Sequence, residues 1–267
     1  RLQAELPAMV AAARQGYADT DTEVQRRMRC GQAGASPGCA VEYRYVAYAL
    51  RVLPPPMVFG QMALGYALVD AGGSRFVGVN IVAPEDHPVA LADYRQHMDM
   101  FRALSQRYPG VKLSLHAGEL ALGLVPPAEL RFHITEAVDA GAARIGHGVD
   151  LAYEADPAAL LRRMRERQVA VEVNLTSNDV ILGVQGGEHP LAMYLAAGVP
   201  VVLSTDDAGV SRVDLTHEYQ RAVQEQGLDY PTLKRIVRNG LSYSFLRGES
   251  LWAADGRAVP ACAAALA

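Results

Sequence analysis

Five side chains that can bind a metal ion or move a proton occupy similar places along the chain. Each ends or closely follows a hydrophobic segment, and they are His116, Glu119, His147, Asp206 and Asp207. Imidazole nitrogens and carboxylate oxygens are ligands that zinc accepts, and a catalytic zinc site keeps one position open for water. Zinc lowers the pKa of that water to about 7, which makes hydroxide available at neutral pH. These residue types therefore predict a metal-dependent hydrolytic site.

The spacing of the carboxylates indicates different roles for them. Neighbours on a strand point to opposite faces, so only one of Asp206 and Asp207 can face a metal. The other must address a substrate from the loop beyond the strand. Two small residues separate Glu119 from His116. That short turn would bring Glu119 beside the metal without making it a ligand, and a protonated carboxyl there can donate a proton to a substrate nitrogen.

Parallel strands are the elements that must position these residues. Hydrophobic, β-branched segments recur, and we expect strands at about 43–51, 76–82, 111–116, 143–147, 169–174 and 199–206. Their ends recur about every 30 residues, the length that a strand and a crossover helix need. Helical patterns fill the intervals. We expect helices at 91–108, 128–140, 214–226 and 232–245, and shorter ones opening at Pro157 and Pro190.

These elements predict an α/β fold. Six βα units fit either an open doubly wound sheet or part of a (β/α)8 barrel. No G-x-G-x-x-G follows a strand, which removes the best support for a dinucleotide-binding fold. The polar residues share the carboxyl ends of the strands, where a barrel builds its active site, so the barrel is favoured. Without a linker between units, we expect residues 1–267 to form one metal-dependent hydrolase domain with C-terminal helices.

The composition excludes several classes of partner. Of the 267 residues 50% are hydrophobic and 20% are charged, which is typical of a folded globular protein. The net charge of −4 argues against a nucleic-acid-binding face. The longest uncharged run, 52–69, contains three consecutive prolines and indicates a turn and a buried helix, not a membrane span. We expect a small-molecule partner, neither nucleic acid nor a membrane, and the sequence indicates no oligomeric state.

Five short motifs occur in order along the chain: S-L-H-A-G-E at 114–119, R-I-G-H-G at 144–148, T-S-N at 176–178, H-P at 189–190 and L-S-T-D-D at 203–207. Together they resemble the ordered motifs of the adenosine deaminase family, over most of the chain. The resemblance implies a zinc-dependent (β/α)8 TIM-type barrel, of which about six βα units are present here. It also implies deamination of adenosine to inosine and ammonia, in which a zinc-activated hydroxide attacks purine C6.

The same resemblance implies a role for each candidate residue. His116 and Asp206 would be zinc ligands, and Glu119 would protonate the purine nitrogen N1. His147 would orient and activate the water, and Asp207 would form a hydrogen bond with N7. The implied cofactor is thus one Zn²⁺ per active site, and the implied ligand is a purine nucleoside.

One part of the family's pattern is absent from the sequence. The family's other two zinc ligands come from an H-x-H motif on the first barrel strand, and no H-x-H occurs here. Residues 43–51 resemble the family's third strand, and residues 1–35 resemble the helix that leads to it. We therefore expect the domain to be N-terminally incomplete by two strands, and the chain on its own to be weakly active or inactive.

Two other functions stay open. An adenine or AMP deaminase would share the motifs, but an AMP enzyme should also carry basic residues for the phosphate. Only Arg212 lies close to Asp207 in the sequence. The other alternative is a barrel that binds purine nucleosides without catalysis or serves as a signalling module. Such a protein would have no use for a proton donor at Glu119, so adenosine deamination leads.

The remaining cysteines and histidines have simpler interpretations. Cys30 and Cys39 flank a loop, and we expect two free thiols. The cytoplasm is the default location, whereas a bridge between them would be typical of a periplasmic or secreted protein. We expect His189 to shape the site structurally. Four further histidines lie on predicted loops or helices, and we expect them to face solvent: His87, His97, His133 and His217.

Overall fold

Six parallel strands form one sheet in the structure, a computed structural model that describes residues 2–253 and 256–263. They are β1 (Tyr45–Leu50), β2 (Phe76–Val82), β3 (Leu113–Ala117), β4 (Ala142–His147), β5 (Ala170–Val173) and β6 (Val201–Leu203). Each strand is hydrogen-bonded to the next one in sequence, in the order β1-β2-β3-β4-β5-β6. A doubly wound sheet reverses its order partway, whereas a barrel wall does not. The predicted α/β fold with a parallel sheet is confirmed.

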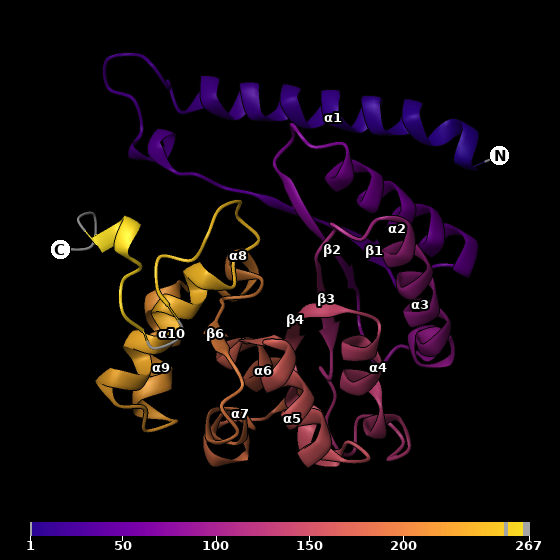
Figure 1. Cartoon of the computed structure of the whole chain (residues 1–267), viewed down its shortest axis with the longest axis vertical. Helices are drawn as coiled ribbons and strands as arrows, with labels where there is room; N and C mark the ends of the chain where they lie inside the picture. Colours follow the sequence, from indigo (N-terminus) through magenta and orange to yellow (C-terminus); the bar gives the residue numbers. More distant parts are fainter. Residues whose placement is uncertain (1, 254–255, 264–267) are drawn as a thin grey trace.

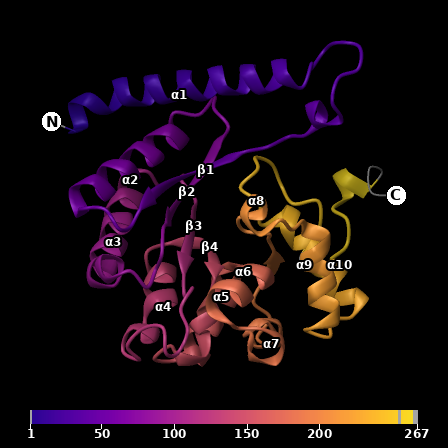
Figure 2. The same cartoon turned by 180° about the vertical axis from the view of Figure 1, so that it is seen from behind.

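Helices form the crossovers between the strands and cover the sheet (Figure 1). Those between strands are α2 (Pro55–Asp70), α3 (Pro88–Arg107), α4 (His133–Asp139), α5 (Pro157–Arg167), α6 (Leu175–Leu182) and α7 (Leu191–Ala196). After β6 come α8 (Ala208–Ser211), α9 (Leu215–Gln224) and α10 (Tyr230–Ser242). The first helix, α1 (Leu2–Arg27), lies across one end of the molecule beside α2, as Figures 1 and 2 both show.

Proline fixes where several helices begin. Pro55, Pro88 and Pro157 each stand in the first turn of a helix, where the fixed φ of proline is favourable and its missing N–H costs nothing. The predicted helix at 128–140 is interrupted at Phe132, which leaves the helical region with φ −153° and ψ −7°. A short 3₁₀ turn, Glu129–Arg131, therefore precedes α4.

The hydrophobic core lies between the sheet and its helices. Leu115, Ile145 and Val171 come from neighbouring strands and have no exposed surface, as expected for a parallel sheet covered by crossover helices. The uncharged run at 52–69 forms a turn and α2, which buries Met62 and Tyr66 against the sheet. Among the described residues, no helix combines the length and the apolar character that crossing a membrane requires.

The prediction of two free thiols was wrong, because Cys30 and Cys39 form a disulfide bond. The chain reverses direction after α1, and the backbone N–H of Ser36 donates to the carbonyl of Met28. Ser36 then caps the short helix that contains Cys39. These local hydrogen bonds bring the two cysteines together.

Reducing this disulfide is expected to loosen one loop without unfolding the domain. None of the residues 28–44 is buried, so little of the hydrophobic core depends on the bond. Dithiothreitol should accelerate tryptic cleavage after Arg29 and leave the thermal midpoint within a few degrees. The variant Cys262→Ala, which keeps the disulfide, should respond in the same way. A large fall of the midpoint on reduction would contradict this expectation.

His97 was predicted to face solvent, but it is only 1% exposed. The residue lies on α3 between Tyr94 and Phe101, which face the core, and side chains three and four apart share one face of a helix. Within the described residues neither ring nitrogen has a hydrogen-bond partner. Burial, together with the positive charge of Arg51, lowers the pKa of His97 to about 4. His87 and His217 are exposed, as predicted.

His97 is therefore expected to make the fold sensitive to acid. Its pKa is lower in the folded state than the ordinary 6.5, so its contribution to stability is present above pH 6.5 and is lost as the pH falls toward 4. The loss is roughly 3 kcal/mol by proton linkage. Urea unfolding of His97→Leu should show a weaker dependence on pH over this range, while the exposed control His217→Leu should match the parent chain.

Candidate active site

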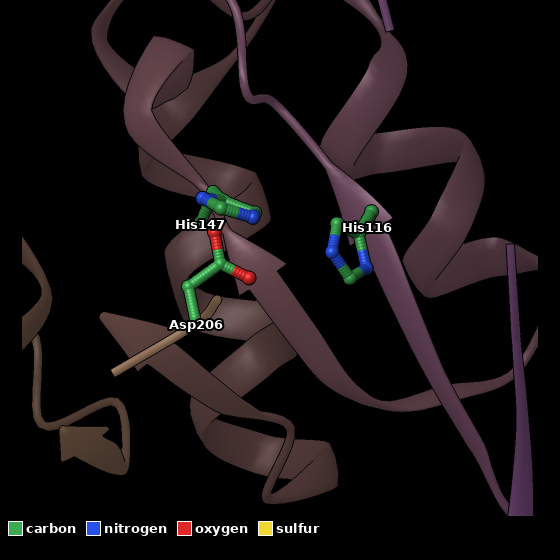
Figure 3. Close-up of side chains that lie close together, drawn as sticks. All are labelled: His116, His147 and Asp206. Carbon is green, nitrogen blue, oxygen red and sulfur yellow. The ribbon is translucent and has the colours of Figure 1, made fainter. Parts of the chain in front are cut away.

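Three of the predicted residues come together where the strands end. His116 is on β3, His147 is the last residue of β4, and Asp206 follows β6. One possible ligand atom from each lies within 4.8 Å of the others. Figure 3 shows the carboxylate of Asp206 directed toward the two imidazole rings. The carboxyl ends of parallel strands thus create the cluster, as the sequence predicted.

The backbone is strained at two members of this cluster. His147 has φ 72° and Asp206 has φ 51°, both in the left-handed region. Histidine and aspartate enter this region more readily than most residues, and such strain gathers at functional sites. β6 ends at Leu203, so the prediction that the strand continues to 206 was wrong. A left-handed turn in the loop, and not strand alternation, orients Asp206. Asp207 is exposed and lies outside the cluster.

Glu119 lies beside the cluster. Its carboxylate oxygen Oε1 is 3.5 Å from Nδ1 of His147. Burial, together with the negative charges of Glu85 and Asp206, raises the pKa of Glu119 to about 8. The carboxyl group is therefore protonated at neutral pH and can donate a proton.

Both histidines of the cluster are neutral and are held by amide side chains. Burial lowers the pKa of His116 and of His147 to about 4. The side chain of Asn80 lies 3.0 Å from Nδ1 of His116, which leaves Nε2 for another partner. The side-chain amide of Asn178 lies 2.9 Å from Nδ1 of His147. Orienting partners of this kind are typical of histidines that bind metals or act as bases.

A buried ionic network lies beneath the cluster. The two oxygens of Glu85 accept the backbone N–H groups of Gly118 and Glu119, each at 3.0 Å. Arg51 lies 3.7 Å from the same carboxylate and donates to the carbonyl of His116 over 2.7 Å. His133 donates to Glu85 over 2.6 Å and is fully buried, so the prediction that it faces solvent was wrong. The network fixes the backbone from His116 to Glu119.

Against the penalty of burial, the charge of Arg51 and the hydrogen bond from His133 lower the pKa of Glu85 to about 2. Glu85 is therefore ionised, whereas Glu119, whose backbone N–H donates directly to Glu85, keeps its carboxyl proton. The buried guanidinium of Arg51 pairs with Glu85, so the two carboxyl groups differ in protonation state at neutral pH. This difference is what a proton donor at neutral pH requires.

Gly118 is required by the turn between His116 and Glu119. It has φ +77°, and a Cβ atom there would lie 2.5 Å from Oδ1 of the buried Asp150. Only glycine combines this backbone with such a close approach. The glycine of the H-A-G-E motif thus explains how two functional side chains fit into four residues.

Sequence reasoning did not identify Arg51, Asn80 and Glu85 as parts of the site, and it gave no role to Asn178 of the T-S-N motif. His189, predicted to be structural, is buried and forms a hydrogen bond with Asn178 over 3.1 Å. The sequence did contain one sign of these supporting residues. A charged or amide residue that lies within an otherwise apolar strand, or just after it, indicates a buried polar contact. This sign applies to Arg51 after β1 and to Asn80 within β2.

The donor set of the cluster suits a metal ion. Two imidazole nitrogens and one carboxylate oxygen are groups that zinc and similar divalent ions accept. Because both histidines are neutral, each imidazole has one ring nitrogen with a lone pair that can bind a metal ion. His116, His147 and Asp206 are therefore the residues that could hold a metal cofactor.

The parallel sheet keeps its strands in sequence order and carries the His, His and Asp cluster at its carboxyl edge, an arrangement typical of the wall of a TIM-type barrel. An amidohydrolase from Burkholderia ambifaria, solved with bound Zn, has a TM-score of 0.62 and 19% identity; the match covers 86% of this chain and 58% of that one. The adenosine deaminase family model matches residues 11–251. The chain belongs to the adenosine deaminase family, whose members are hydrolases.

One curated protein and one further solved structure are also similar to this chain. An adenosine deaminase from Shewanella loihica is 36% identical over 143 residues, which are 52% of this chain and 40% of that protein. The N6-methyl-AMP deaminase from Arabidopsis thaliana has a TM-score of 0.60 and 22% identity, and the match covers 76% of this chain and 54% of the other. The chain thus matches less than half the length of the curated Shewanella protein.

Proposed function

We propose that this chain carries the catalytic residues of a zinc-dependent adenosine deaminase. The observation that carries the proposal is the convergence of His116, His147 and Asp206, with the carboxyl group of Glu119 beside His147. Family membership supplies the reaction class, and the Shewanella relative supplies adenosine as the substrate to test first. Residues 1–267 would form one hydrolase domain.

Zinc is the proposed metal, with His116 and Asp206 as ligands from this chain. When bound there, zinc supplies activation of water for attack on purine C6. His147 is neutral and fully buried, so it is suited to orient that water and accept its proton. Glu119 holds a proton at neutral pH and would donate it to N1 of the purine, which makes C6 more electrophilic.

Asp207 is the proposed substrate contact. It is exposed and follows Asp206 directly, so it can reach a ligand in front of the cluster without competing for the metal. We propose that its carboxylate interacts with the N7 side of the purine.

The substrate is tested by comparing three purines. The chain should be loaded with zinc and assayed for ammonia release from adenosine, AMP and adenine. Adenosine is expected to react fastest, because Arg212 is the only basic residue close to Asp207 along the chain. A preference for AMP would instead support a nucleotide deaminase, as in the Arabidopsis relative.

A measurement of zinc binding distinguishes an incomplete deaminase from a chain that is not a deaminase. Without turnover, zinc binding that is lost in His116→Ala and in Asp206→Ala would support the metal site. Activity should then appear when a first-strand H-x-H segment from a curated relative is joined to the chain. If the joined protein shows neither zinc binding nor activity, the catalytic proposal is contradicted. A barrel that binds nucleosides without catalysis then remains as the alternative.

A further inference from the structure

A cavity lies at the end of the sheet opposite to the His116, His147 and Asp206 cluster. It is a cavity of about 1020 Å³ between α1, the beginnings of β1 and β2, and the segment after α10 that contains Arg247. The catalytic cluster lies at the other, carboxyl ends of the strands. Because the seven residues of β2 span about 20 Å, the two sites are separated by the depth of the sheet.

The wall of this cavity is rich in arginine, although the chain as a whole carries a net charge of −4. Four arginines and two carboxylates line it, namely Arg14, Arg44, Arg75, Arg247, Asp21 and Glu42. The lining therefore has two positive charges in excess. An anion is attracted to this surface more strongly than to the surrounding acidic protein.

The two carboxylates are already satisfied by neighbouring groups. Arg75 forms an ion pair with Asp21 at 2.9 Å, and the hydroxyl groups of Tyr43 and Tyr45 donate to the same carboxylate. Arg44 forms an ion pair with Glu42 at 2.8 Å. The acidic residues thus neutralise Arg75 and Arg44, and the positive excess falls on the remaining arginines.

Arg14 and Arg247 carry that excess. Within the described part of the chain, neither forms an ion pair or a side-chain hydrogen bond. Both guanidinium groups border one turn: Nη2 of Arg14 is 2.9 Å from the position of a Cβ on Gly73, and Nη2 of Arg247 is 3.4 Å from that on Gly72. Two guanidinium groups beside one turn offer several N–H donors to the oxygens of a phosphate group.

An aromatic surface adjoins the arginines. Tyr17, on α1, lines the cavity and is 42% exposed. Its ring is held from behind, with its centroid 5.2 Å from that of Tyr45 and 4.7 Å from that of Phe76. A fixed, partly exposed ring next to cationic groups can pack against the planar ring of a ligand.

We propose that this cavity binds a phosphorylated small molecule with an aromatic ring, such as a nucleoside phosphate. Arg14 and Arg247 hold the phosphate group, and Tyr17 packs against the ring. The partly enclosed volume suits a free small molecule. The site is independent of the deaminase site.

Calorimetric titration of the chain with inorganic pyrophosphate and with AMP tests this proposal. Both are expected to bind with saturation at one site per chain and to weaken as salt is added. The double variant Arg14→Ala/Arg247→Ala should weaken pyrophosphate binding at least about tenfold, since each arginine supplies charge-assisted hydrogen bonds. The matched control Arg162→Ala/Arg165→Ala removes the same charge from α5 and should bind as the parent chain does.

Two further measurements show whether the ligand binds in this cavity and not at the deaminase site. Saturating adenosine should leave pyrophosphate binding unchanged, and Tyr17→Leu should weaken AMP but not pyrophosphate. If the alanine variant is unfolded by circular dichroism, Arg14→Lys/Arg247→Lys replaces it and should still weaken binding, because lysine lacks the planar fork. Absence of saturable binding, equal binding by the arginine variants and the control, or displacement by adenosine would each overturn the proposal.

Discussion

Glu119→Gln is expected to lower the rate of adenosine deamination by about 10²- to 10⁴-fold, the usual contribution of a general acid. Glutamine keeps the size of the side chain but has no carboxyl proton to donate. The pKa of Glu119, raised to about 8 by burial and by the charges of Glu85 and Asp206, keeps the parent residue protonated at neutral pH. The loss should appear in kcat, measured as inosine formation with zinc present, in the protein joined to the first-strand H-x-H segment.

Two comparisons make this result specific to Glu119. Zinc binding should be unchanged in Glu119→Gln, because the residue lies beside the His116, His147 and Asp206 cluster and is not part of it. Glu166→Gln, an exposed change on α5, should retain the parent rate. A Glu119→Gln protein that deaminates adenosine within tenfold of the parent would exclude Glu119 as the proton donor.

Glu85→Ala is expected to destabilise the fold by about 3–5 kcal/mol, the usual cost of removing one partner of a buried ion pair. The side chains of Arg51 and Glu85 are 0% and 1% exposed, so the remaining guanidinium would stay buried without its counter-charge. The N–H groups of Gly118 and Glu119 would also lose their acceptor. Denaturant unfolding of the chain measures the change directly.

A double variant shows whether the cost comes from the unpaired charge. Arg51→Met/Glu85→Leu removes both charges and should be less destabilised than Glu85→Ala, since no buried charge remains. Glu23→Gln is the exposed control, because Glu23 pairs with Arg26 on the surface of α1 and should contribute little. Equal destabilisation of the single and double variants would show that lost packing, and not charge, dominates.

Much of the fold could be predicted because the strands repeat at regular intervals. The apolar segments at 76–82 and 143–147 correspond to β2 and β4 almost residue for residue. The end of β6 was less accurate, because Ser204 to Asp206 continue a pattern compatible with a strand. In the structure β6 ends at Leu203, and the backbone then becomes left-handed at Asp206.

The convergence of three side chains could be predicted from the sequence, but the groups that hold them in place could not. His116, His147 and Asp206 share the ends of strands, which sequence periodicity can locate. Glu85 and His133 meet through side chains 48 positions apart, a pairing that periodicity does not encode. His97 was misplaced for a related reason, because a histidine on an amphipathic helix gives no sign of which face it occupies.

The strand order also has a consequence for how the domain forms on the ribosome. Each of β2 to β6 pairs with the strand that was synthesised just before it, so every pairing closes a loop of similar, modest length. Loop-closure entropy rises slowly with length, and local pairings favour rapid folding. The sheet can therefore grow one strand at a time as the chain emerges. His116 and His147 would therefore come together before Asp206 has been translated.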